Sequence, residues 1–317
     1  MSDLYNGVSE ELIVSDAIIV AGAGICCLDH IVTSPAVKWG DTAMVSDYQA
    51  QGGGLVATAM VACARLGASC RFYSLLGDDT VGDQIATGML EENVLTDGIV
   101  RVRGGCSPFS FIHVDEKTGE RTIFHRPGSG LDRGIECLDL SGLLTAQALL
   151  VDDVYPSLSI SAAKAARANS IPVVADMASG QANAEVLGHV DILVAPKHFA
   201  SEHGLQDNLP KALDKIHELG PTTAVITLGS QGCIFSDKSG IGRCKPFEVD
   251  VVDTTGAGDA FHGAFTYGVA RGWDTGRCAE FASAVAAIKC TKPGGRTGLP
   301  SLPQTIEFLR QNGGLEW

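Results

Sequence analysis

Hydrophobic positions along the chain fall into short, unbroken apolar runs that alternate with longer segments of helical character. Strands buried on both faces have such continuous runs, because neither face meets water. The runs predicted as strands are 17–21, 71–76, 148–151, 172–176, 191–195 and 223–228. The segments predicted as helices are 55–66, 81–92, 159–168, 259–271 and 277–290. This alternation predicts an α/β fold with a mostly parallel central sheet and helices on both faces.

Two stretches, 32–51 and 99–126, break this alternation. In them polar and apolar residues alternate, with turns such as Glu116-Lys-Thr-Gly119. A period of two is typical of strands with one exposed face, so these stretches predict a small separate β-sheet. Because no linker rich in proline, glycine or serine divides the chain, we expect one domain over 17–317, preceded by an acidic tail over 1–16.

An excess of acidic side chains narrows the range of partners. The 317 residues include 37 acidic and 23 basic side chains, for a formal charge of -14, and such a surface repels phosphate backbones and anionic membranes. The sequence has no apolar run long enough for a membrane span, and its N-terminus has no signal-peptide core. We therefore expect a cytoplasmic protein with no nucleic-acid or membrane partner. The ten cysteines are scattered, as is typical of buried, reduced thiols.

The segment Gly256-Ala-Gly-Asp259 carries the clearest candidate chemistry. Its two glycines allow a tight turn, and the apolar run that follows predicts a helix, so several backbone amides would lie at a helix N-terminus. Such a turn suits the charge on a phosphoryl group in transfer. Asp259 is then either a base that accepts a hydroxyl proton or a residue that only caps the helix. Spacing alone leaves both interpretations open.

Four blocks of the sequence, in the same order, resemble the ribokinase-like (PfkB) family of carbohydrate kinases. The blocks are Gly53-Gly-Leu-Val-Ala-Thr-Ala-Met-Val-Ala-Cys-Ala-Arg-Leu-Gly67, Ser74-Leu-Leu-Gly-Asp-Asp79 with Gly82, Thr227-Leu-Gly-Ser-Gln-Gly232 and Asp253-Thr-Thr-Gly-Ala-Gly-Asp-Ala-Phe261. The resemblance implies an ATP-dependent phosphotransferase with an alcohol group as acceptor. It also implies a ribokinase-like fold in which the stretches 32–51 and 99–126 form a β-sheet lid over the sugar.

The same resemblance implies roles for individual positions. Asp259 matches the general base, and the anion hole that accompanies it matches Gly256, Ala257 and Gly258. The implied substrate-binding residues are Asp29, Gly53, Gly54 and Asp259. The positions implied for the nucleotide are Lys197, Thr227, Gly229, Ser230, Gly232, Gly256 and Gly258.

Two metal ions belong to the implied reaction. Mg²⁺ accompanies ATP, and many family members bind K⁺ at positions that match Asp253 and Thr255, together with backbone carbonyls over 290–295. The turn Lys292-Pro-Gly-Gly-Arg296 places two cationic side chains near the expected nucleotide end. There they would either contact phosphate or line the loop over 290–295 that is expected to bind the cation.

Two positions depart from the family pattern. Family members often have an Asn-x-x-Glu pattern that helps to organise magnesium, but this chain has Pro196-Lys-His-Phe-Ala200, with Lys197 in place of the asparagine. Thr58 replaces an asparagine that is common in the N-terminal signature. The route of magnesium coordination and the preferred sugar are therefore open.

The identity of the acceptor has to be inferred separately from the reaction. Segments 247–263 and 281–298 look very like bacterial sulfofructose kinases, in which a lysine, an asparagine and an arginine are expected to hold the sulfonate. Those three positions fall on Thr42, His125 and Tyr155, and none matches. We therefore favour a sugar of ketohexose or ribose type, with sulfofructose and nucleosides as alternatives. The open strand edges of the lid favour a homodimer through the lid.

Two other classes of function are weighed against the sugar kinase. The turn Gly22-Ala-Gly24 after the first strand is part of a dinucleotide fingerprint and would suit an NAD-dependent oxidoreductase, but position 27 is cysteine instead of the third glycine. A kinase-like sensor without catalysis is the other possibility, because Lys197 departs from the pattern, although Asp259 is intact. His262, one turn beyond Asp259, is expected to be packed instead of catalytic.

Overall fold

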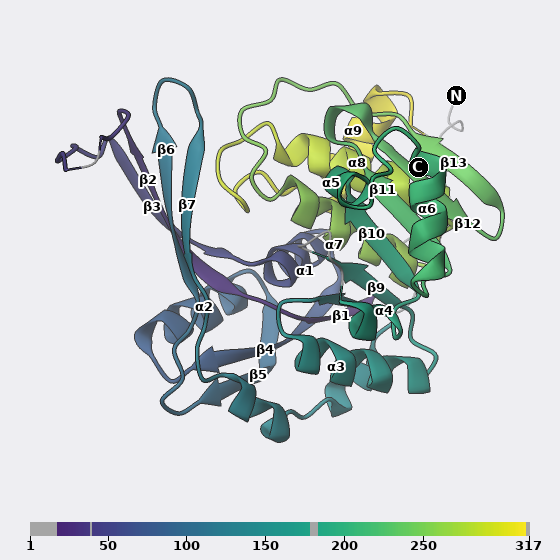
Figure 1. The fold of residues 1–317 in the computed structure, drawn as a ribbon, viewed down its shortest axis with the longest axis horizontal. Coiled ribbons are helices and arrows are strands. Elements are labelled where there is room, and N and C mark those ends of the chain that lie inside the picture. The colour runs from purple at the N-terminus through teal and green to yellow at the C-terminus, as the bar shows by residue number, and fades with distance from the viewer. Residues whose placement is uncertain (1–17, 39, 178–182, 315–317) are drawn as a thin grey trace, which may run out of the picture.

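The computed structural model describes residues 18–38, 40–177 and 183–314, and the predicted tail over 1–16 lies outside them. Over the described residues the strands form one large and one small sheet (Figure 1). The large sheet has, from edge to edge, β13 (Gly240–Cys244), β12 (Cys233–Asp237), β11 (Thr223–Thr227), β10 (Ile192–Pro196), β9 (Val173–Asp176), β8 (Ala148–Asp152), β1 (Ile19–Ala23), β4 (Ser69–Gly77) and β5 (Val94–Val102). From β11 to β5 all neighbours are parallel, whereas β12 is antiparallel to both of its neighbours, β11 and β13.

Helices cover both faces of the large sheet, so the predicted α/β fold is confirmed. One core contains side chains of α1 (Leu55–Arg65), α2 (Thr80–Glu91), α7 (Ala257–Ala270), α8 (Thr275–Lys289) and α9 (Leu302–Gln311). The other contains side chains of α3 (Pro156–Ala168), α4 (Ala184–Leu187), α5 (Lys197–Glu202) and α6 (Leu209–Glu218). Successive strand residues such as Val20 and Ala21 point into opposite cores, which is why the strands are apolar throughout. Short 3₁₀ turns are η1 (Asp132–Cys137), η2 (Ser141–Thr145) and η3 (Gly229–Gln231).

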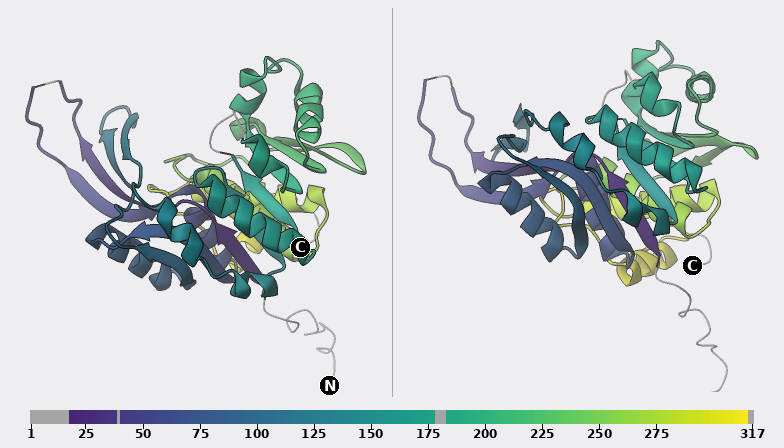
Figure 2. Two further views of the ribbon diagram at one scale, coloured as in Figure 1. Left: turned by 60° about the horizontal axis from the view of Figure 1, so that its bottom comes forward. Right: turned by 90° about the horizontal axis from the view of Figure 1, so that it is seen from below.

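The small sheet projects from one end of the body as a lid (Figure 2). Its strand order is β3 (Asp47–Gly53), β2 (Cys27–Ser34), β6 (Phe109–Asp115) and β7 (Arg121–Arg126). The expected lid segments differ in extent from these strands. The first lid strand already begins at Cys27, and residues 99–102, expected in the lid, belong to β5 and pair with β4 in the large sheet. Alternation alone cannot distinguish an edge strand of the large sheet from a lid strand, because both have one exposed face.

Helix α7 runs through the core and is buried along most of its length. Ten of its residues between Ala260 and Ala270 are buried, and a Cβ added at Gly263 would overlap the backbone of Ala59 in α1. This close approach of two helices fixes where α7 begins, at the carboxyl ends of the parallel strands. Ligands bind at that edge in open α/β sheets. None of the helices over the described residues is long and apolar enough to cross a membrane.

Candidate active site

Asp259 lies in the first turn of α7, at the strand edge just described. The N-cap of this helix is Gly256, with a φ of 74° and no side-chain cap. Asp259 therefore does not cap α7, and the capping interpretation of this residue is wrong. The Ala257 amide donates to the Thr254 carbonyl over 3.2 Å. Ala257 and Gly258, two of the three residues expected in the anion hole, line a large cavity that is described below.

The surroundings of Asp259 favour a carboxyl group that binds protons more readily than usual. Burial raises its pKa well above the ordinary value, and the carboxylates of Asp176 and Asp29 raise it further. The cationic side chains of Arg296 and Lys289 act in the opposite direction. A base with a raised pKa is better matched to proton transfer near neutral pH, so this environment suits the role that the sequence predicts for Asp259.

On the lid side, Asp29 in β2 packs directly onto the backbone of β3. A Cβ added at Gly53 would overlap the Asp29 carboxylate, so a larger residue there would displace this carboxylate. Gly54 has a φ of 94°, and a Cβ added there would come within 2.6 Å of the Ile25 carbonyl oxygen. The Cys27 thiol donates to Asp29 Oδ1 at 3.2 Å. Three of the four substrate-binding positions expected from the sequence, Asp29, Gly53 and Gly54, are thus together at the base of the lid.

Arg296 is a member of this site whose place the sequence analysis missed. The expected location was the nucleotide end, but the guanidinium is buried on the lid side, with 6% of the residue exposed. Its Nε donates to Thr58 Oγ1 and its Nη2 to the Gly53 carbonyl, both at 3.3 Å. The departure of Thr58 from the family asparagine was a partial signal, because the Thr58 hydroxyl accepts a hydrogen bond from Arg296. Lys292, by contrast, is exposed.

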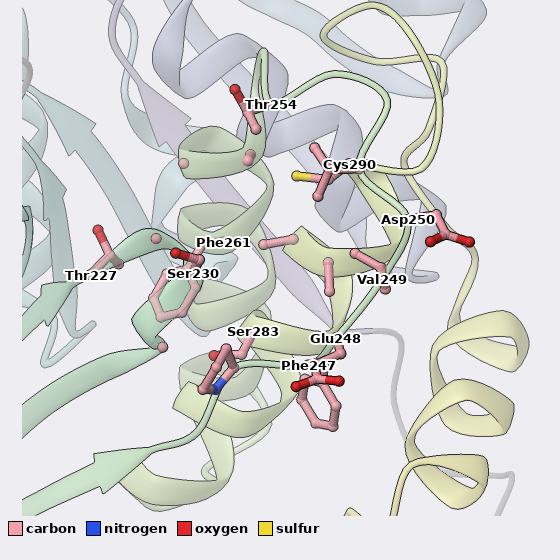
Figure 3. Close-up of a pocket in the computed structure, with 18 residues that line it drawn as sticks. Thr227, Ser230, Phe247, Glu248, Val249, Asp250, Thr254, Phe261, Ser283 and Cys290 are labelled. Carbon is pink, nitrogen blue, oxygen red and sulfur yellow. The ribbon is translucent and has the colours of Figure 1, made fainter.

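On the other side of Asp259 lies a cavity of about 910 Å³ (Figure 3). The sequence-predicted nucleotide positions at this cavity are Thr227, Gly229, Ser230, Gly232 and Gly258. In Figure 3 Thr227 and Ser230 lie on one side and Glu248 and Val249 on the other. Its walls include the apolar side chains of Phe247, Val249, Val251, Phe261, Ala286 and Ala287. A large cleft with apolar walls beside a helix N-terminus can hold an aromatic base and its phosphates.

Lys197 lies outside this cavity lining, at the start of α5. Its side chain is exposed, and Nζ donates to Gln231 Oε1 over 3.4 Å. Gln231 belongs to the turn η3, between the cavity residues Gly229 and Gly232. Lys197 thus contacts the η3 turn through Gln231 and does not line the cavity.

The two residues expected at the cation site, Asp253 and Thr255, are already engaged with the protein. The Asp253 carboxylate accepts hydrogen bonds from the Thr255 and Gly294 amides, each at 2.8 Å. Burial alone would raise the pKa of Asp253, but these hydrogen bonds and the Lys289 ammonium hold it below the ordinary value. Arg121 of the lid donates to Thr255 Oγ1 at 2.9 Å. Among the described residues no cluster of three His, Cys, Asp or Glu side chains suits a metal ion.

His262 is packed beneath the site, as expected. It is 4% exposed, and Nε2 lies 3.0 Å from the Val194 carbonyl. Its Nδ1 lies 2.7 Å from the Gly258 carbonyl and 3.2 Å from Asp176 Oδ2. His262 therefore ties the first turn of α7 to the last residue of β9 and to the middle of β10.

The turn Gly22-Ala-Gly24 has a structural explanation that needs no dinucleotide. A Cβ at Gly22 would lie 2.6 Å from Met60, and one at Gly24 would overlap the Asp152 carboxylate. Asp152 Oδ2 accepts the Ile25 amide at 2.7 Å, and burial raises the Asp152 pKa to about 7. The glycines are needed for packing, and the oxidoreductase alternative has no support from this turn.

Comparisons with known proteins agree with the fold described above. The ribokinase of Haemophilus influenzae is 31% identical over 291 residues, which is 89% of this chain and 95% of that protein. The ribokinase of Bacillus subtilis is 28% identical over 289 residues, 90% and 97% of the two chains. The solved ribokinase of Thermotoga maritima has a TM-score of 0.82 and 27% identity, covering 92% of this chain and 99% of that one. The family model "pfkB family carbohydrate kinase" matches residues 20–302. This chain is accordingly a member of the pfkB family of carbohydrate kinases, phosphotransferases with an alcohol group as acceptor.

Proposed function

We propose that this protein transfers the γ-phosphoryl group of ATP to a primary hydroxyl of a sugar of ketohexose or ribose type, with Asp259 as the general base. The observation that carries the proposal is the position of Asp259 between two sites. Its neighbours Ala257 and Gly258 line the cavity of about 910 Å³. The side chains of Asp29 and Arg296, on the lid side, are close enough to act on its pKa.

In the proposed reaction the sugar lies between Asp29 and Asp259, and the triphosphate extends from the cavity to the start of α7. The Asp259 carboxylate accepts the proton of the hydroxyl while the hydroxyl oxygen bonds to the γ-phosphorus. The bond from that phosphorus to the bridging oxygen breaks, and ADP leaves. The amides at the start of α7 would stabilise the charge on the phosphoryl group.

Mg²⁺ enters this proposal as part of the nucleotide substrate. Magnesium is commonly held through phosphates, waters and few carboxylates, and such binding agrees with the absence of a His, Cys, Asp or Glu cluster over the described part of the chain. Lys197 stays a proposed nucleotide contact, which requires its ammonium to turn from Gln231 toward the phosphates.

The sugar class rests on the relatives. Those at 31% and 28% identity are ribokinases, and a rice protein 26% identical over 287 residues is named fructokinase-1. The test is a screen for ADP formation with Mg-ATP and with ribose, fructose, tagatose, nucleosides and sulfofructose as separate acceptors. We expect turnover with ribose or a neutral ketohexose. Turnover only with sulfofructose or a nucleoside would overturn this ranking.

We further propose that two copies associate through the lid. Register and alternation place Phe111 and Phe124 opposite each other on the lid face away from Asp29. Tyr48 lies on the same face, and the three side chains are 45–56% exposed. Exposed aromatic groups on a sheet with open edges favour a covering partner. Light scattering of the wild type and of Phe111→Ser with Phe124→Ser tests this: the pair of substitutions should yield monomers, and a monomeric wild type would contradict it.

A further inference from the structure

Lys289 is a fully buried lysine beside the site, and the proposed reaction does not use it. It is the last residue of α8, and it is 0% exposed. Its ammonium donates to the backbone carbonyl of Asp253 at 2.8 Å. A buried ammonium is costly unless it is paired. Burial lowers the Lys289 pKa below its ordinary value and the Arg121 guanidinium acts in the same direction, whereas the Asp253 carboxylate, the Cys290 thiol and the Asp259 carboxylate favour the charged form.

This ammonium contacts one of the two residues expected at the monovalent cation site. Asp253 is one of the two residues matched to that site, and its carbonyl is the group that Lys289 contacts. The hydroxyl of Thr255, the second residue, accepts from Arg121. The Cys290 carbonyl, first of the expected backbone ligands, accepts the amides of Val252 and Asp253 at 2.8 and 3.1 Å.

These contacts do not fit a bound K⁺. A metal ion at the Asp253 carbonyl would lie against the ammonium of Lys289, and two like charges at contact distance in a buried site repel strongly. The Asp253 carboxylate, the Thr255 hydroxyl and the Cys290 carbonyl also already accept hydrogen bonds from the protein. The positive charge beside the Asp253 carbonyl is thus supplied by the side chain of Lys289.

We propose that the Lys289 ammonium replaces the monovalent cation, so that this kinase needs no K⁺. The ammonium holds the carbonyl of Asp253 and, through it, the segment that leads to Gly256 and the start of α7. A bound ion has to be taken from solution, whereas Lys289 is present in every molecule at any salt composition. The inference rests on the proposed kinase function only for its activity measurement, because ion binding can be measured without turnover.

The experiment compares salts of K⁺, Na⁺ and tetramethylammonium at equal ionic strength. Wild-type turnover and thermal midpoint should be the same in all three salts. Lys289→Ala opens a cavity against the Asp253 carbonyl, so its turnover should be low in tetramethylammonium and recover with K⁺ or methylammonium. K⁺ should also raise the thermal midpoint of this variant without any substrate, by mass action on the folded state.

Lys292→Ala is the matched control, because it removes the same charge three residues after Lys289, at an exposed position of the loop that follows α8. The turnover and the thermal midpoint of this variant should be the same with and without K⁺. The proposal is overturned if K⁺ activates the wild type about tenfold or more, a change of about 1.4 kcal/mol, or raises its thermal midpoint. Lys289→Ala with full turnover in tetramethylammonium would overturn it too. If no acceptor is phosphorylated, the proposed function fails, while the thermal midpoints still decide the role of Lys289.

Discussion

Arg296 and Thr58 are joined by a hydrogen bond of 3.3 Å from the guanidinium Nε to the hydroxyl Oγ1. The bond connects the loop after α8 to helix α1, and the same guanidinium also holds the Gly53 carbonyl. Because Gly53 lies directly against Asp29, one buried cation supports the base of the lid and the carboxylate proposed to bind the sugar. It also lowers the pKa of Asp259.

Arg296→Gln should therefore change the pH dependence of the enzyme. Loss of the guanidinium raises the pKa of Asp259 further. A general base is inactive when protonated, so kcat/KM is lost as pH falls through this pKa, and the acid limb of the profile should move to higher pH. The KM for the sugar should also rise. Arg243→Gln, at an exposed position of β13, should leave both unchanged, and an unmoved acid limb in Arg296→Gln would contradict the coupling to Asp259.

Asp259→Asn should lower turnover by about a hundredfold or more, on the order expected for the loss of a general base. Folding should be retained, because Asp259 is not the N-cap of its helix. The measurements are ADP formation under saturating substrates and the thermal shift with Mg-ATP, which should persist. As a control, Asp274→Asn changes an aspartate that does cap its helix, α8, by accepting the Arg277 amide, and it should keep near-normal turnover. Near-normal turnover in Asp259→Asn would show that another group is the base.

Gly256→Ala should reduce both stability and turnover. The residue has a φ of 74°, and an added Cβ would lie 2.6 Å from the Gly295 carbonyl oxygen. The left-handed conformation alone costs a residue with a side chain about 1–2 kcal/mol, which chemical denaturation can measure. Relief of this contact would also move the start of α7.

Gly258→Ala is the comparison for that variant. Its Cβ would meet nothing within 4 Å, so the stability should be retained. Because Gly258 lines the cavity, the added methyl group should raise the KM for ATP. Equal loss of stability in the two alanine variants would argue against the geometry at Gly256.

His262→Leu should destabilise the protein without removing a catalytic group. It removes the imidazole that lies 3.2 Å from Oδ2 of the buried Asp176 carboxyl, and a buried unsatisfied group costs about 1–3 kcal/mol. Urea denaturation should show the loss, while turnover of the folded fraction stays within about tenfold of wild type. His203→Leu removes a half-buried imidazole that contacts the Phe199 carbonyl at 2.9 Å, and it should cost less. Loss of turnover at unchanged stability would indicate that His262 acts in catalysis.

Local pattern determined much of the architecture. The apolar runs of β8 to β11 and the helices α1, α2, α7 and α8 lie within a few residues of their predicted bounds, since continuous burial and helical spacing are recorded in neighbouring residues. The glycine turn before Asp259 also indicated a helix start, because tight turns need residues without a Cβ. No pattern of neighbouring residues predicted the register of the lid or the assignment of β5 to the large sheet, because edge strands of either sheet have one exposed face.

The sequence by itself determined the fold class, the family and the place of Asp259 at the head of a helix, because these depend on short segments. Only the tertiary structure decided what surrounds that carboxylate. Lys289 stands in the last turn of a helix, where a lysine commonly interacts with the helix dipole and water, yet here it is buried against Asp253. Arg296 reaches α1 from a loop 238 residues away in sequence. Burial of a charge depends on partners from distant segments, which no local pattern specifies.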